Sequence, residues 1–368
     1  MYIINVFAAL CLLLPLAAAG ISLFGHEASS EHALLSALTK SKEDADHDGS
    51  PGVPHRDYVV SLPHSDSVLS ERLQWWYWTG HLADANNSSK TFGFELCFFL
   101  VDGFTQLVHV ALTDVSNDAF HFAESVRINV PPKTEGSFSL TTDIASASGG
   151  DGTDALRFSV GEYELFLSLD SGANSPTVHY SGRRHEYSFG GYTLYYSRTK
   201  MSTTGTLLHS PTNSSAALVG NSWFDRQYGD LFVAVLQGWM WFAIELSDGR
   251  DVMLFDFLKD DTEKSGSVTG PDGVVAELAG GDFEILVLDD WTSDKTGCTY
   301  PSEWSVKLAG GSEGGGESFL LRPVVKDQEL DVHFTPKYWE GKVDVFDITG
   351  KEKVGEAYVE LNGFCTLF

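Results

Sequence analysis

Basic side chains are scarce in this chain. Its 368 residues include 24 Lys and Arg against 51 Asp and Glu, which gives a formal net charge of −27 at pH 7. Nucleic acids and anionic membrane surfaces repel such a surface. The composition therefore argues against nucleic acid as a partner. Because the acidic residues are spread along the chain, they indicate a solvated surface rather than an interaction tail.

Common metal-binding and phosphate-binding motifs are also lacking. The sequence contains no His-Glu-x-x-His and no Cys-x-x-Cys pattern. Asp44 to Gly49 imitates the start of a calcium-binding EF-hand loop, but Pro51 interrupts it and His55 stands where a glutamate is required. The Gly-rich segment 309–316 lacks the Lys-Ser/Thr pair of a phosphate loop. We expect no metal, flavin or nucleotide cofactor.

Only one long hydrophobic run is present, and it lies at the N-terminus. Val6 to Ala19 is apolar but too short to span a bilayer, and it ends in three alanines. This pattern predicts a signal peptide over residues 1–19, a secreted protein, and no stable insertion in a membrane. Residues 20–60 are polar and predict a linker or pro-segment.

The chain has few cysteines, and one of its four, Cys11, leaves with the signal peptide. Cys97 lies in an apolar run and is expected to be a buried thiol. At most one disulfide can then form, and we expect it to join Cys298 and Cys365.

Three glycosylation sequons lie in polar segments, at Asn86, Asn87 and Asn213. The first two overlap, so we expect only one of them to be modified. They agree with an extracellular location.

Helical periodicity is nearly absent after Leu62. Apolar and polar residues alternate in many short segments, for example Thr91 to Val101 and Tyr163 to Leu169, and turn signals and 36 glycines separate them. This pattern predicts an all-β protein built as barrels or sandwiches. There are too many strands for one small barrel, so we divide the chain into domains 61–237 and 238–368. The oligomeric state cannot be read from the sequence.

Tryptophans are concentrated in three blocks, which is unusual for a purely structural pattern. One block holds Trp75, Trp76 and Trp78, the second holds Trp223 and Tyr228, and the third holds Trp239 and Trp241. Aromatic faces suit a flat, apolar and transiently cationic ligand. We consider Trp76, Trp78, Trp223, Tyr228, Trp239, Trp241 and Tyr196 as substrate-binding residues, with ordinary core packing as the alternative for each.

Four polar residues are candidates for catalysis. Asp256 lies in an apolar strand and shares a face with Leu254 and Leu258, so burial would keep it protonated as an acid. A carboxylate paired with a basic group is the alternative. Asp225 and Arg226 point to opposite faces of a strand, where one can reach a cavity or both can form interdomain ion pairs. His109 can relay a proton or be a satisfied core residue.

A family resemblance is carried by blocks spread over nearly all of the mature chain. They are residues 74–82, 92–95, 109–114, 196–198, 222–229, 238–242, 300–304, 327–330, 338–341 and 355–361. In these blocks the sequence resembles the hydroxyneurosporene synthase/AttH-like family of double-lipocalin proteins. That family includes carotenoid 1,2-hydratases, the secreted kievitone hydratase and, more distantly, fungal decalin-forming Diels–Alderases. Gln74 departs from the acidic residue often found at that position, which argues against an acid there.

The resemblance implies two lipocalin-like β-barrels with a substrate cavity in or between them. It also implies a cofactor-independent hydratase (a hydro-lyase) that adds water to an isoprenoid double bond of a hydrophobic metabolite. One scaffold hosts several activities, so a cyclase or pericyclase and a lipocalin-like carrier remain alternatives. On the residues alone, we expect a cavity between or beside the barrels, lined by Trp76, Trp239, Trp241 and Tyr228, with Asp225 or Asp256 as its polar group.

These features predict that the mature protein begins near Gly20 and carries N-linked glycans at Asn86 or Asn87 and at Asn213. N-terminal sequencing and the mass change on glycosidase treatment check this. An intact Met1 on secreted material, or an unchanged mass, would contradict it.

Overall fold

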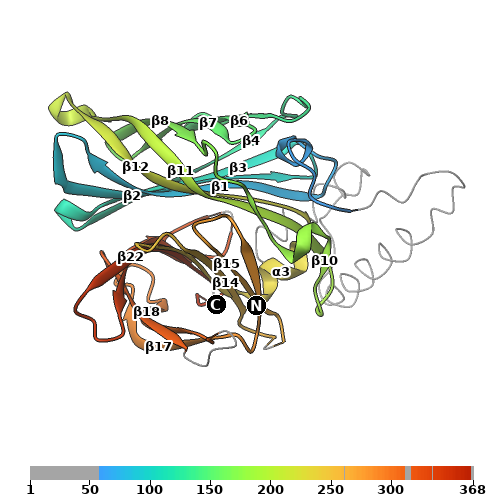
Figure 1. Cartoon of the computed structure of the whole chain (residues 1–368). Coiled ribbons are helices and arrows are strands. Elements are labelled where there is room, and N and C mark those ends of the chain that lie inside the picture. Colours follow the sequence, from blue (N-terminus) through green and yellow to red (C-terminus); the bar gives the residue numbers. More distant parts are fainter. Residues whose placement is uncertain (1–57, 261, 311–315, 334, 366–368) are drawn as a thin grey trace, which may run out of the picture.

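The computed structural model describes residues 58–260, 262–310, 316–333 and 335–365. They form two curled antiparallel sheets that lie face to face (Figure 1). The predicted all-β class with two barrel-like units is confirmed. None of the helices in these ranges is long and apolar enough to cross a membrane.

The first sheet has twelve strands in the order β4-β3-β2-β1-β12-β11-β8-β7-β6-β5, and β9 and β10 also pair with β11. The strands are β1 (Leu73–Asp84), β2 (Asn87–Val101), β3 (Thr105–Asp114), β4 (Ala119–Ile128), β5 (Phe138–Thr141), β6 (Ala145–Gly150), β7 (Thr153–Val160), β8 (Tyr163–Asp170), β9 (Thr177–Val178), β10 (His185–Glu186), β11 (Tyr192–His209) and β12 (Ser214–Asp230). Short 3-10 helices lie at η1 (His64–Asp66), η2 (Val115–Asn117), η3 (Tyr180–Gly182) and η4 (Ser210–Thr212).

The second sheet has ten strands in the order β16-β15-β14-β13-β22-β21-β19-β18-β17, with β20 paired to β21. Its strands are β13 (Trp239–Leu246), β14 (Asp251–Phe257), β15 (Lys264–Thr269), β16 (Val275–Ala279), β17 (Phe283–Thr292), β18 (Thr299–Leu308), β19 (Glu317–Pro323), β20 (Glu329–Leu330), β21 (Tyr338–Asp347) and β22 (Lys353–Asn362). The short helix α3 (Phe232–Gln237) connects the two sheets.

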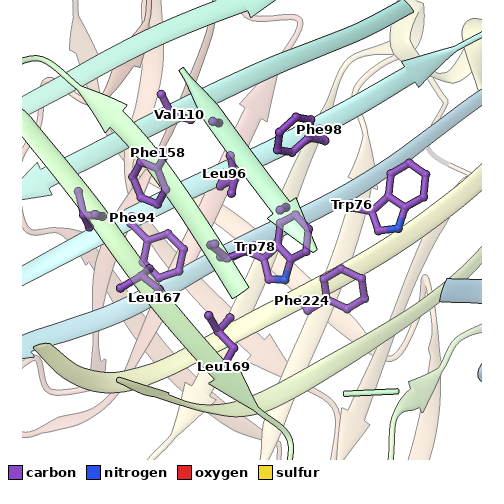
Figure 2. Close-up of a cluster of buried hydrophobic side chains, with 14 of the residues drawn as sticks. Trp76, Trp78, Phe94, Leu96, Phe98, Val110, Phe158, Leu167, Leu169 and Phe224 are labelled. Carbon is purple, nitrogen blue, oxygen red and sulfur yellow. The ribbon is translucent and has the colours of Figure 1, made fainter. Parts of the chain in front are cut away.

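Strand alternation creates the core of the first barrel. Side chains two residues apart point to the same face of a strand, and one face of β1, β2, β7, β8 and β12 carries large apolar groups. Trp76, Trp78, Phe94, Phe158 and Phe224 fill the inside of this barrel (Figure 2). Each fully buried large side chain contributes about 1.5–3 kcal/mol. A separate cluster that includes Phe242, Trp304 and Trp339 fills the second barrel.

The central strands are buried on both faces because the barrels pack against each other. All ten residues of β3 are buried. On β1, Trp76 and Trp78 face the barrel interior, whereas Tyr77 belongs to a third apolar cluster together with Trp241 and Tyr358 of the second sheet. This third cluster forms the interface between the barrels.

A buried ion pair anchors the segment before β1 to the first barrel. Arg198 donates from its two terminal nitrogens to the two carboxylate oxygens of Asp66, at 2.9 and 3.0 Å. Asp66 is fully buried, and it also accepts from the Tyr196 hydroxyl and from the backbone N–H of Asp151. The carboxylate is thus satisfied from three directions.

Replacing one partner of this pair leaves a buried charge without its counter-charge, which costs about 3–5 kcal/mol. We therefore expect Arg198→Met to lower the free energy of unfolding by that amount. The double variant Arg198→Met with Asp66→Asn should recover part of the loss, because no isolated charge remains. Urea unfolding measures both. A loss below about 1 kcal/mol in the single variant would refute the role of the pair.

Candidate functional site

A pocket lies between the two sheets, outside both barrel cores. It holds about 740 Å³ of empty space, part of which is open to solvent. Its walls come from β1, β2, β3 and β12 on one side and from β13, β14, β21 and β22 on the other, and Val235 of α3 contributes at one end.

The strand register brings the wall residues into two opposing rows. In the first sheet, cross-strand neighbours align His109, Cys97, Tyr77 and Asp225. In the second sheet, they align Phe255, Trp241, Glu360 and Glu340. The hydroxyl of Tyr77 donates a hydrogen bond to the Glu340 carboxylate, which joins the two rows. The site is therefore assembled by the docking of one barrel on the other.

Three glutamates gather in this pocket. Glu95 and Glu340 are fully buried, whereas Glu360 is partly exposed. Burial raises the pKa of all three carboxyls, to about 7 for Glu360 and well above the ordinary value for the other two. The negative charges of neighbouring glutamates raise the pKa of Glu95 and Glu340 further. A carboxyl that keeps its proton near neutral pH can act as an acid.

Glu95 has the most apolar setting of the three. Neither of its carboxyl oxygens has a hydrogen-bond partner among the described residues. An ionised carboxylate without donors would be very unfavourable there, so the neutral acid is the stable form.

Asp225 is held more firmly than the glutamates. One carboxylate oxygen accepts from Ser197 Oγ at 2.5 Å and from the Trp223 indole N–H at 2.6 Å, and the other accepts from the Tyr195 hydroxyl at 2.5 Å. Burial raises the pKa of Asp225 to about 7, although these three donors act in the opposite direction. The donors fix the carboxylate in place and satisfy its negative charge when it forms.

His109 lies at the β3 end of its row. Its Nδ1 is 2.7 Å from the Tyr338 hydroxyl, and its Nε2 is 3.8 Å from the carboxylate of Glu124. Burial lowers the pKa of His109 to about 3, so the imidazole is neutral near pH 7. In this state the ring can accept from Tyr338 but adds no positive charge to the pocket.

Aromatic rings form much of the remaining wall. Trp241 meets Tyr77 edge to face with ring centroids 5.4 Å apart, and its indole N–H donates to the Tyr195 hydroxyl at 3.3 Å. Trp239 packs on Phe255, with centroids 5.8 Å apart. Trp75 lies on the wall of the first sheet, on the face of β1 opposite to Trp76.

Several aromatic candidates from the sequence point into the first barrel instead. Trp76, Trp78 and Tyr196 belong to its core, so the expectation that they line the ligand cavity is corrected for this pocket. Each aromatic block supplies side chains to both faces of its strand. Because successive side chains point to opposite faces, every second ring lies inside the barrel. Trp223 does not line the pocket either, but it supports Asp225 from the adjacent position.

Arg226 and Tyr228 also face away from the pocket. The Arg226 guanidinium lies 3.8 Å from the Trp76 ring centre and 4.8 Å from that of Tyr228. It donates to the backbone oxygens of Ser65 and Ser67 and to the side-chain oxygen of Gln74. Arg226 thus holds the segment before β1, and the proposed roles of Arg226 and Tyr228 at the ligand are corrected.

Asp256, the first acid candidate from the sequence, is outside the pocket. It shares the inward face of β14 with Leu254, and its carboxylate forms an ion pair with Lys264 at 2.9 Å. Asp256 is therefore a carboxylate paired with a basic group, which was the alternative to an acid role for this residue. Phe255, the adjacent residue, takes the wall position.

The sequence reasoning missed Glu95, Glu340 and Glu360, although each lies in a block that carries the family resemblance. The sequence does contain one signal for them: a single acidic residue in an apolar strand, on the face opposite to the side chains that fill the barrel. In β2, Glu95 alternates with the inward residues Phe94 and Leu96. That signal cannot be interpreted unless one knows that the second face is also buried.

The remaining sequence candidates lie away from the pocket, apart from Cys97. Cys298 and Cys365 form a disulfide with Cα atoms 5.1 Å apart, and Cys97 is a free, buried thiol in the pocket wall. Asn86, Asn87 and Asn213 are exposed in turns or at a strand end. The candidate signal peptide lies outside the described residues. Among the described ranges, no cluster of three His, Cys, Asp or Glu side chains suits a metal ion.

The raised pKa of Glu95 makes stability depend on pH. Since the unfolded chain ionises Glu95 near pH 4.5 and the folded protein does so only at higher pH, the stability from this group is complete below pH 4.5 and is lost as pH rises. We expect Glu95→Gln to gain stability relative to the wild type between pH 5 and 8, by about 1.4 kcal/mol per unit of pKa shift.

Urea unfolding at pH 5 and pH 8 measures this gain. Glu284→Gln, a substitution at an exposed site on β17, serves as the matched control and should show no such pH dependence. A constant difference between Glu95→Gln and wild type across this range would contradict the expected burial of a neutral acid.

Comparison with known proteins gives relatives for most of the chain. Its structure resembles that of an AttH protein from Nitrosomonas europaea, with 20% identity, a TM-score of 0.71, and coverage of 86% of this chain and 100% of that one. It also resembles kievitone hydratase from Nectria haematococca, with 16% identity, a TM-score of 0.67, and coverage of 84% and 94%. No curated protein sequence matches this chain. The AttH-like family model matches residues 54–364, and the chain therefore belongs to the AttH-like family.

Proposed function

We propose that this protein is a hydratase that adds water to an isoprenoid double bond of a hydrophobic metabolite. The observation that carries the proposal is that the half-buried Glu360 lines a pocket with Trp239 and Trp241. Burial there raises the pKa of its carboxyl to about 7. The likeness to kievitone hydratase, which is a likeness of fold, supports the same reaction class.

Glu360 is assigned as the acid. The π electron pair of the alkene takes the proton of Glu360 and forms a new C–H bond at the less substituted carbon. The other alkene carbon becomes a tertiary carbocation, and Glu360 is left as a carboxylate. The faces of Trp239 and Trp241 stabilise this cation through their ring quadrupoles. The negative charge of Asp225 favours the protonated state of Glu360 before the reaction, because it makes a second negative charge in the pocket less favourable.

Asp225 is assigned as the base. A water molecule attacks the carbocation, and the resulting oxonium loses a proton to the Asp225 carboxylate. The proton then returns to Glu360 through water in the open pocket, so no proton is consumed over the cycle. Three hydrogen-bond donors keep Asp225 oriented, which limits the reorganisation needed during the reaction.

The leader-like run Val6 to Ala19 and the exposed sequons support a secreted enzyme, which we include in the proposal. The pocket walls support an apolar small molecule as the substrate. A cyclase would need the shape of the pocket but no acid, and a carrier would return its ligand unchanged. These two activities are outcomes of the following test.

Glu360→Gln should reduce hydration by about 10²- to 10⁴-fold while ligand binding persists, because only the transferable proton is lost. The assay incubates the purified protein with a panel of prenylated phenols and detects the gain of one water by mass spectrometry. Asp256→Asn is the matched control. Asp256 lies on the face of β14 that points away from the pocket, so this variant should retain turnover.

Three results would contradict the proposal. Undiminished hydration by Glu360→Gln would remove Glu360 as the acid. An isomeric product of unchanged mass would identify a cyclase. Recovery of every bound ligand unaltered would identify a carrier.

A further inference from the structure

We propose that the pocket between the barrels is a binding site for hydrophobic organic cations, with quaternary alkylammonium ions as the chemical class. The observation behind this proposal is that four carboxyl groups and several aromatic rings share one pocket, without a basic side chain to neutralise them. The proposal extends beyond hydration and does not require turnover.

The charge of the wall has one sign. Asp225, Glu95, Glu340 and Glu360 contribute carboxyl groups, and no Lys or Arg lines the pocket in the described part of the chain. Two lysines lie close to the lining residues in sequence, and both already have partners. Lys342 of β21 is bound to Glu356 at 2.6 Å and to His81 at 2.8 Å, and Lys337, just before β21, forms an ion pair with Asp331. An entering cation would therefore be the first counter-charge for the carboxylates of the pocket.

The nearby arginine is also unavailable. Arg226 is adjacent to Asp225 in sequence, but strand alternation turns it into the first barrel, where Trp76 and backbone oxygens surround it. The register that brings Asp225 to the pocket thus excludes Arg226 from it.

Aromatic rings supply the second part of the recognition. A cation gains energy when it lies within about 6 Å of an aromatic ring centre, and tryptophan is the best partner. Trp75, Trp239, Trp241 and Phe255 approach the same space from both sheets. A trimethylammonium group has an apolar surface that suits such walls, and its positive charge suits the acidic groups beside them.

The charge of the site depends on pH. The titratable groups that face the pocket are Tyr77 on β1, Glu95 and Cys97 on β2, His109 on β3, Asp225 on β12, Tyr338 and Glu340 on β21, and Glu360 on β22. Burial keeps the phenols and the thiol neutral by raising their pKa, and it keeps His109 neutral by lowering its pKa to about 3. Asp225 and Glu360, whose pKa values burial raises to about 7, therefore supply the change of charge near neutral pH, and cation affinity should rise from pH 6 to pH 8.

Three probes of nearly equal size test the proposal on the full-length protein. They are (2-naphthylmethyl)trimethylammonium, its neutral carbon isostere 2-neopentylnaphthalene, and the anion 2-naphthylmethanesulfonate. Quenching of tryptophan fluorescence reports binding. The quaternary ammonium has no titratable proton, so any pH dependence between pH 6 and 8 comes from the protein.

We expect the ammonium probe to bind about tenfold more tightly at pH 8 than the neutral isostere, which corresponds to a cation–aromatic and carboxylate contribution of ordinary size. This preference should diminish at pH 6. Glu360→Gln should reduce it while affinity for the neutral isostere is unchanged, which also verifies the fold. Asp256→Asn should retain the full preference.

Equal or tighter binding of the neutral isostere would overturn the proposal, as would tight binding of the sulfonate or no binding of any probe. A preference for the ammonium that does not change in wild type between pH 6 and 8 would also overturn it. Because these measurements involve no turnover, loss of the hydratase assignment would leave them interpretable. Absence of cation binding would likewise leave the hydration assay unaffected.

Discussion

The two-residue repeat of the β-strand is the constraint on which this molecule depends. Each central strand must supply one set of side chains to a barrel core and another set to the surface between the barrels. On β12, Phe224 and Arg226 face inward while Asp225 faces the pocket. A shift of register by one residue would exchange these sets and would place the acids in the barrel cores.

The pocket concentrates acidic groups that work against folding. Glu95 and Glu340 are removed from water without a basic partner, and their protons are retained because ionisation is so unfavourable there. The barrel cores compensate with extensive apolar burial, and buried polar contacts such as Arg198 with Asp66 are fully satisfied. Strain of this kind at a functional site is typically offset elsewhere in the fold.

The fold was predictable because its signal is local, whereas the site depends on contacts between distant segments. Alternation within Thr91 to Val101 indicated a strand, which the structure confirms inside β2. The same alternation could not show which face of β1 would meet a second barrel, so Trp76 was predicted at the cavity, whereas Trp75 and Tyr77 lie there. Glu95 and Glu340 are more than two hundred residues apart in sequence and meet only after docking.

The connection between the barrels has a consequence for how the pocket exchanges its contents. Only residues 231–238, including α3, lie between the end of β12 and the start of β13. A tether this short holds the second barrel at a millimolar effective concentration near the first. The interface therefore needs little intrinsic affinity of its own, and it can accommodate the acidic groups of the pocket. The pocket therefore exists only where the two sheets are docked, and exchange of its contents does not require either barrel core to open.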